Sequence, residues 1–188
     1  MRTLNLQIVG STPLLLHHIS RHQLREQIAS VKGATMSMDE EALEMMVKDK
    51  HGNPAVPVSW LWDALRVGCS RITIEQKQVS FTRLQSIIKL SEGVLSLKDT
   101  DNHVPEWKTY SSLQHSASGS KKSVTVIAPM FKDWMFVLPI LVSTNIIPDN
   151  PIENDRLLER IFVEAGRVGI GLFHPPKKHF GQFRISVL

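Results

Sequence analysis

The side chains with the clearest chemical potential lie near the carboxyl end of the chain, between residues 166 and 188. This stretch contains no Asp or Glu, and its strongly basic residues are Arg167, Lys177, Lys178 and Arg184. Its glycines are Gly166, Gly169, Gly171 and Gly181. Glycine adopts backbone conformations closed to residues with a Cβ, and a glycine-rich loop can offer N–H groups to an anion. The stretch therefore predicts a surface that contacts the phosphate backbone of a nucleic acid.

A second basic group lies near the centre of the chain, beside a segment rich in Ser and Gly. It can close over phosphates that the terminal loop contacts from another side. The predicted phosphate contacts of both groups are Lys121, Lys122, Arg167, His174, Lys177, Lys178 and His179. The alternative interpretation is a basic surface that contacts only solvent.

Aromatic side chains supply candidate platforms for base stacking, which contributes roughly 1–3 kcal/mol per base. Phe173 and Phe180 flank the basic terminal segment and are the favoured platforms. Trp60, Trp62 and Trp107 are more typical of a hydrophobic core.

Two arginines lie near the end of an apolar helical segment. Arg66 and Arg71 are candidates for a second row of phosphate contacts. Equally, they can cap helix carbonyls or pair with Asp63 or Glu75.

The composition predicts one folded domain that binds no membrane. The chain has 188 residues, 42% of them apolar, and a formal net charge of +4. Its longest apolar run, residues 135–142, contains Pro139 and falls far short of the roughly 20 residues that span a bilayer. The single cysteine, Cys69, and the alternating residues at the amino end predict an intracellular, cytoplasmic protein.

The amino-terminal half predicts a strand followed by helices. Residues 3–9 alternate like a strand, and a helix begins at Ser20 and ends near Lys32. Residues 37–40 fit a capping box for a short helix with an apolar stripe, and residues 49–54 form a turn. The stripe comprises Leu43, Met46 and Val47. Ser59 is expected to cap a largely buried helix that reaches Cys69.

The second half predicts a hairpin, two strands, a helix and a closing strand. The hairpin joins residues 86–90 to residues 94–97, and residues 98–122 form a loop or a thumb-like projection. Strands follow at 123–128 and 134–142, then a helix that begins near Pro151 and is capped by Gly166. Residues 182–188 close the domain, with Phe183, Ile185 and Val187 inward and Arg184 outward.

The strongest elements follow the order β-α-β-β-α-β, which is the plan of an α+β, ferredoxin-like (RRM-type) domain. Its antiparallel sheet is covered by helices on one face, which leaves the other face, or the loops at its edge, for single-stranded nucleic acid. We expect a single domain over residues 1–188, with a helical insertion at about 20–50 and the loop or thumb at about 98–122.

Two segments resemble the RAMP superfamily, which includes CRISPR backbone subunits. Residues 52–66, Gly-Asn-Pro-Ala-Val-Pro-Val-Ser-Trp-Leu-Trp-Asp-Ala-Leu-Arg, are similar to its Gly-x-Pro-x-Ile/Val-Pro-x-Ser-x-Leu-x-x-x-Leu-Arg signature. The terminal Gly-Ile-Gly and Phe-Gly-Gln-Phe segments resemble its closing glycine-rich loop and strand, with Gln182 at a position where the family has Arg. The order of motifs is more similar still to small RAMP-like proteins of bacteriophages.

The resemblance implies an RRM-derived fold that coats RNA or single-stranded DNA, with copies side by side along the strand. It implies a homo-oligomer or filament, effector-complex subunits as partners, and a bacterial cell, with phage origin included, as the setting.

Two alternatives stay open at this point. RAMP-related RNA-processing enzymes use histidine as a general acid or base, and some backbone subunits use an Asp before the Gly-x-Pro turn. The resemblance therefore makes His17, His18 and Asp39 the candidate residues of an endoribonuclease, with Asp49 the other nearby carboxylate. The last alternative is a phage assembly or interaction protein without a nucleic-acid ligand.

The sequence contains no recognisable cofactor or metal motif. The lone Cys69 and the scattered histidines lack ligand spacing, and the glycines of residues 166–171 follow a predicted helix where a dinucleotide fingerprint follows a strand. We therefore expect no cofactor, no metal and no enzymatic activity, and binding that is largely independent of sequence.

Overall fold

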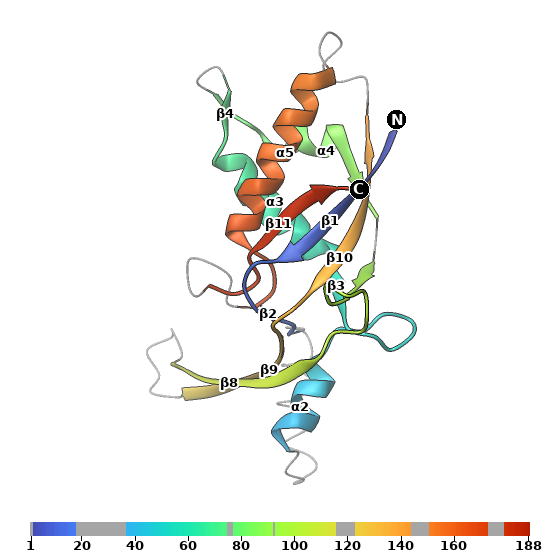
Figure 1. Ribbon diagram of the computed structural model, residues 1–188. Coiled ribbons are helices and arrows are strands. Elements are labelled where there is room, and N and C mark those ends of the chain that lie inside the picture. The colour runs from blue at the N-terminus through green and yellow to red at the C-terminus, as the bar shows by residue number, and fades with distance from the viewer. Residues whose placement is uncertain are drawn as a thin grey trace.

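The computed structural model describes residues 2–17, 37–74, 77–91, 93–115, 123–143, 151–172 and 179–188, and these form a mixed α+β structure with antiparallel sheets (Figure 1). The helices in these ranges are α2 (Met38–Met45), α3 (Val58–Ser70), α4 (Phe81–Ile87) and α5 (Pro151–Val168). The longer strands are β1 (Arg2–Gly10), β8 (Trp107–His115), β9 (Ser123–Phe131), β10 (Met135–Val142) and β11 (Phe183–Val187). The short strands are β2 (Leu14–Leu15), β3 (Ala55–Pro57), β4 (Thr73–Ile74), β5 (Lys77–Gln78), β6 (Ile88–Leu90) and β7 (Val94–Ser96).

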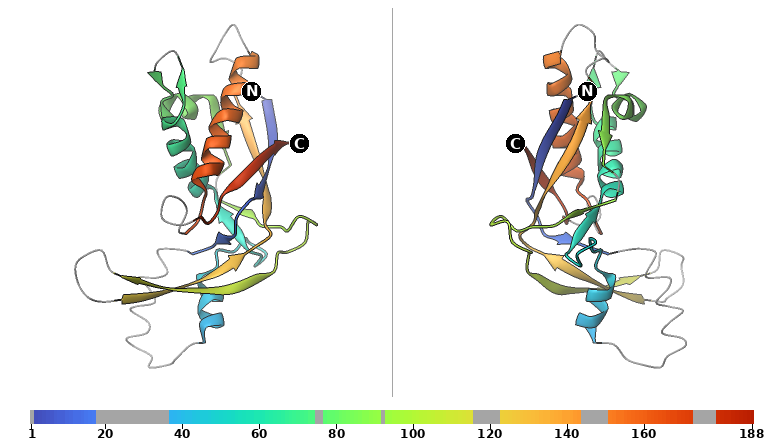
Figure 2. Two further views of the ribbon diagram at one scale, coloured as in Figure 1. Left: turned by 60° about the vertical axis from the view of Figure 1, so that its left-hand side comes forward. Right: turned by 90° about the vertical axis from the view of Figure 1, so that its right-hand side faces the viewer.

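The larger layer is a four-stranded sheet in the order β11-β1-β10-β6, with every neighbouring pair antiparallel. In sequence, α3 lies between β1 and β6, and α5 lies between β10 and β11. This arrangement is compatible with the predicted β-α-β-β-α-β plan. Figure 2 shows α3 and α5 on the same side of the sheet.

Alternation in β1 and periodicity in α5 direct apolar side chains into one core. Leu6 and Ile8 of β1 are buried, as predicted for one face of that strand. The predicted stripe of α5 is also buried and comprises Leu157, Leu158, Ile161, Phe162 and Ala165. Helices α3 and α5 approach each other closely at Gly68 of α3, where a Cβ would lie 2.8 Å from the carbonyl oxygen of Ile161 in α5.

A second, smaller layer contains the sheet β2-β9-β8, with α2 packed against β8 and β9 (Figure 1). The predicted capping box at the start of α2 is confirmed, because Ser37 and Glu40 each accept a hydrogen bond from the other's backbone N–H. The predicted stripe is partly wrong. The helix ends at Met45, so Met46 and Val47 are buried beyond it, while Leu43 is exposed.

The predicted hairpin between residues 86–90 and 94–97 is wrong. Strands form at both places, but β6 pairs with β10 and β7 pairs with β3. The helix α4 also occupies residues 81–87, so the first predicted strand begins only at Ile88. Because apolar strands do not encode their partners locally, the neighbours were decided by the tertiary fold.

Two predicted helix ends are also wrong. Helix α3 begins at Val58 after Pro57, so Ser59 lies inside the first turn and does not cap it. Helix α5 continues through Gly166 to Val168, and Gly169 takes the left-handed conformation with φ +81°. Gly166 is required for a different reason, since a Cβ there would lie 2.3 Å from the carbonyl oxygen of Phe183.

The remaining differences concern the second half of the chain. Strand β8 occupies residues 107–115, inside the segment predicted as a loop or thumb, and pairs along its whole length with β9. Arg184 is exposed as predicted, but Val187 is 65% exposed at the end of the edge strand β11, where it was expected to face inward. The predicted helix of residues 20–32 lies outside the described residues.

Candidate nucleic-acid interface

One face of α3 forms a wall of the candidate site. Trp60, Asp63, Ala64 and Val67 recur at the spacing that brings side chains to one face of a helix. This face lies away from Leu61, Leu65 and Cys69, which are buried in the core. The helix therefore presents an aromatic ring and a carboxylate beside an apolar patch.

The floor is formed by residues 168–172, which are the last residue of α5 and the glycine-rich segment that follows it. Gly169 and Gly171 have φ values of +81° and +80°. A Cβ on Gly171 would lie 2.7 Å from the carbonyl oxygen of Leu15, so only glycine allows this close approach. The N–H of Leu172 donates to that same oxygen at 3.1 Å, which fixes the segment against β2.

The expectation that these glycines expose free N–H groups is wrong for the described residues. The N–H of Gly169 donates to Ala165, and that of Gly181 donates to Pro13 at 2.8 Å. Gly181 in turn accepts from Ile170 at 2.9 Å. The glycines therefore serve close packing of backbone on backbone, because internal carbonyls already occupy their donors.

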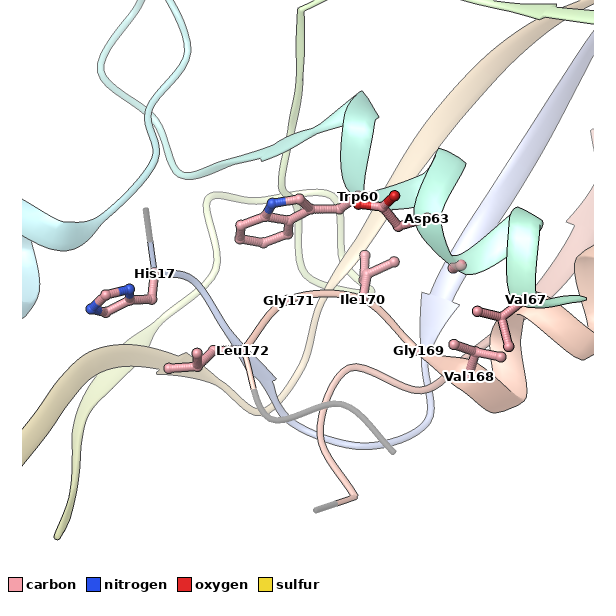
Figure 3. A pocket seen from close by; sticks show the side chains of 10 residues that line it. His17, Trp60, Asp63, Val67, Val168, Gly169, Ile170, Gly171 and Leu172 are labelled. Carbon is pink, nitrogen blue, oxygen red and sulfur yellow. The ribbon is translucent and has the colours of Figure 1, made fainter. Parts of the chain in front are cut away.

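Between this floor and α3 lies a hollow of about 220 Å³, hereafter the α3–glycine groove. It is lined by His17, Trp60, Asp63, Ala64, Val67 and residues 168–172. Figure 3 shows the Trp60 ring over the loop at Gly171 and Leu172, with His17 on the far side of the opening. The groove thus combines one aromatic ring, one carboxylate and one imidazole with apolar walls.

Three predicted basic residues lie on α3, at its end and on α5, each beside an acid, and Arg71 lines a separate hollow with Glu159 and Glu164. Arg66 is 3.3 Å from Asp63 and lies 5.3 Å above the ring centre of Phe81. Arg71 and Arg167 both contact Glu164, at 3.8 Å and 2.5 Å. The guanidinium groups are held in place, but their side chains stay 45–67% exposed.

Gln182, at the position where the related motif has Arg, holds the ends of the loop together. Its side-chain amide donates to the carbonyl of Arg167 at 3.0 Å, and its N–H donates to the hydroxyl of Thr12 at 2.9 Å. The residue therefore connects the end of α5 to the turn after β1.

The predicted aromatic platforms have different surroundings. Phe180 is half-buried and meets the ring of Tyr110 edge-on at 5.3 Å, which ties the terminal segment to β8. Trp62 packs edge-on against Phe81 and, like Trp107, lies against the core. Trp60 is the aromatic residue that lines the groove.

The candidate catalytic residues are separated in the described structure. His17 is 6% exposed and lines the groove. Asp39 lies in the first turn of α2, where it accepts a hydrogen bond from Thr109, and it is not among the residues that line the groove. Asp49 accepts hydrogen bonds from Ser96, His51 and Asn53, and these lower its pKa to about 2, with Ser96 contributing most. Asp49 therefore stabilises its turn.

Several predicted contacts lie outside the described residues, namely His18, Lys121, Lys122, Phe173, His174, Lys177 and Lys178. His179 is described and exposed. Sequence reasoning missed the role of Asp63, Val67 and Tyr110. The helical spacing of Trp60, Asp63 and Val67 could have indicated that Asp63 and Val67 share a face with Trp60. No pattern in the sequence indicated that Tyr110 contacts Phe180.

Comparisons with known proteins find a structural likeness without a sequence family. No family model matches the chain, and no curated protein matches it. A chain in the cryo-EM structure of a type III-B Cmr-beta complex bound to cognate target RNA is similar, with a TM-score of 0.56 and 12% identity. The match covers 99% of this chain and 60% of that chain, so this protein spans only part of its structural neighbour. The likeness shows a shared fold.

The described residues contain neither a membrane-spanning helix nor a metal-binding cluster. None of the helices described is both long and apolar enough to cross a membrane. Within the same ranges, no group of three or more His, Cys, Asp or Glu side chains is arranged to hold a metal ion.

Proposed function

We propose that this protein binds single-stranded nucleic acid, RNA or DNA, without cleaving it, through phosphate contacts and base stacking. The observation that carries the proposal is the α3–glycine groove, which is lined by a half-buried tryptophan and has the exposed Arg66 and Arg167 next to its lining residues Asp63 and Val168. The fold supports it, because a similar chain belongs to a complex bound to RNA. Aromatic rings beside arginines form the kind of surface that holds single strands.

The finer assignment of the fold is part of this proposal. The strand order β11-β1-β10-β6, with α3 and α5 as crossovers, supports a ferredoxin-like, RRM-type domain of the RAMP superfamily. It is a single domain with insertions at about 20–50 and 98–122. In this proposal, cytoplasmic protomers lie side by side along the strand, alone or with effector-complex subunits, and the protein is related to small RAMP-like proteins of bacteriophages.

The ion pairs at the groove do not prevent phosphate binding. Exposed pairs of this kind contribute only about 0–1 kcal/mol, so a phosphate can replace the carboxylate of Glu164 beside Arg71 and Arg167. In the same way, Arg66 can exchange its contact with Asp63 for a contact with a phosphate. The proposed contacts are Arg66, Arg71, Lys121, Lys122, Arg167, Phe173, His174, Lys177, Lys178, His179 and Phe180.

Fluorescence anisotropy of labelled single strands at several salt concentrations tests the proposal. Affinity should fall as salt rises, with a slope in log Kd of roughly 0.7 per neutralised phosphate. Replacing both Arg71 and Arg167 with Gln should reduce that slope by about one unit or more and weaken binding of every sequence. Glu164→Gln should have the opposite effect, because it releases both arginines.

Arg2→Gln is the matched control, since Arg2 is also an exposed arginine paired with an acid, Asp155, near the opposite end of α5. Its substitution should leave the slope unchanged. Binding that is insensitive to salt would contradict the proposal. So would an Arg2 variant as weak as the double variant. Absence of any binding to RNA or DNA would instead favour the alternative of an assembly or interaction protein without a nucleic-acid ligand.

The endoribonuclease is the second candidate because His17 lines the groove. Labelled RNA incubated with the purified protein should remain intact if the protein only binds. Discrete products that disappear in a His17→Ala variant would favour the enzyme.

A further inference from the structure

The α3–glycine groove has the dimensions and lining of a pocket for one flat ring. Its volume of about 220 Å³ is below the roughly 300–1,000 Å³ of pockets that hold drug-sized ligands, so it accommodates a single ring system. Its walls are Trp60 and Val67 from α3 and the backbone of residues 168–172. The loop cannot collapse into the hollow, because Ile170 and Leu172 are hydrogen-bonded to carbonyls behind it.

Among the described residues that line the groove, Trp60 is the only tryptophan, and its surroundings differ from those of Trp62. Trp62 is engaged edge-on by Phe81, whereas among the described residues no ring packs on Trp60. One edge of the Trp60 ring lies close to Gly171, at 3.5 Å from where a Cβ would stand. The loop therefore contacts one edge of the indole, and the rest of the Trp60 ring lines the groove (Figure 3).

Asp63 sets the chemistry of what can enter. Its carboxylate is 70% exposed one turn after Trp60 and lines the same groove. An ionised carboxylate only accepts hydrogen bonds and repels phosphate. It can accept from the exocyclic amino group of cytosine, adenine or guanine, whereas thymine and uracil have no such group and offer only the ring N3–H as a donor. A phosphate is thus excluded from this position and a base with an amino group is favoured.

We propose that the α3–glycine groove takes one unstacked nucleobase bearing an exocyclic amino group, with Trp60 as its stacking platform and Asp63 as its hydrogen-bond acceptor. This inference rests on the proposed function and adds a preference among bases to it. The strand runs past the groove on its arginines, and one base turns inward.

Anisotropy with labelled oligo(dC) and oligo(dT) of equal length tests the pocket. The wild-type protein should bind oligo(dC) more tightly. Trp60→Leu keeps an apolar contact with Gly171 but removes the π face, and it should weaken binding of oligo(dC) by roughly 5- to 100-fold. Trp60→Phe keeps a ring and should retain most of the affinity, while Trp62→Phe is the control for loss of an indole elsewhere on α3.

Asp63→Ala should bring the ratio of the two affinities close to one. This ratio is the decisive readout, because release of Arg66 raises affinity for both strands alike. Asp101→Ala, at an exposed carboxylate in another turn, should leave the ratio unchanged.

The outcomes separate this inference from the proposed function. Salt-dependent binding that is unaffected by Trp60→Leu, or a ratio that survives Asp63→Ala, would overturn the base pocket and leave the proposed function intact. A wild-type protein that binds neither strand would overturn both.

Discussion

The open face of the four-stranded sheet and the α3–glycine groove differ in chemistry. On the open face, Val137, Pro139 and Leu141 of β10 are exposed beside polar residues of β1. No aromatic residue is exposed there among the described strands. The groove on the helix side has an indole, a carboxylate and neighbouring arginines. A sheet of the RRM type therefore does not by itself locate the binding surface; the exposed side chains do.

The largest effect should come from the glycines that shape the groove. In Gly181→Ala the new Cβ would lie 1.8 Å from the carbonyl oxygen of Ile170, at a φ of +68°. We expect the variant to lose more than about 3 kcal/mol of unfolding free energy, or not to fold, because the new Cβ collides with a backbone oxygen that cannot turn aside as a side chain could. Urea denaturation followed by circular dichroism measures this.

Gly52→Ala is its matched control, since Gly52 has a φ of +84° but no atom within 4 Å of a Cβ. It carries the conformational strain without the collision and should cost about 1–2 kcal/mol. Equal losses in the two variants would mean that the loop is not held by close packing.

An intermediate effect is expected from pH through Cys69, which is buried in the core near the end of α3. Burial raises the pKa of this thiol from 9.0 to about 11. A raised pKa means that the folded state favours the protonated thiol, so its contribution is complete below pH 9 and is lost as pH rises through 11. The loss should be on the order of 1–3 kcal/mol.

Urea titrations at pH 8 and pH 10.5 compare the wild type with Cys69→Ala. Other groups ionise in this interval in both proteins, so the difference between them isolates the thiol. The wild type should lose more stability over the interval than the variant. An equal loss in both would show that the thiol is open to solvent, in which case alkylating reagents should modify it in the folded protein.

The smallest effect should come from the open sheet face. Arg184 and Lys89 are exposed on β11 and β6. Replacing both with Gln should change the affinity for single strands by less than about twofold at physiological salt, where distant charges are screened. If anisotropy shows a loss as large as that of the Arg71 and Arg167 variant, the sheet face binds the strand and the contrast between the two surfaces is wrong.

Local patterns predicted the elements that depend on neighbouring residues. The alternation of β1, the capping box of Ser37 and Glu40, and the apolar stripe of α5 all appear in the structure. The partners of β6 and β7 did not follow from such patterns, since they depend on residues more than 30 positions away in the chain.

The candidate site was predicted in part. Arg66 and Arg167 do lie near the groove, and one alternative for Arg66, pairing with Asp63, is what the structure shows. The terminal glycines were correctly singled out but for a different reason, because their N–H groups bond to Ala165 and Pro13. A sequence reveals that a residue lacks a Cβ, but not which atom occupies the space.

By itself, the sequence determined strand β1, the capped start of α2, the apolar stripe of α5 and the acid-free glycine-rich end, because hydrophobic periodicity, capping and backbone freedom act over a few residues. Only the tertiary structure decided that Trp60 and Asp63 of α3 share a groove with residues 168–172, more than 100 residues later. The physical reason is that this proximity comes from the packing of α3 against α5 and from backbone hydrogen bonds to Leu15 and Pro13. These contacts form only when distant segments of the chain meet.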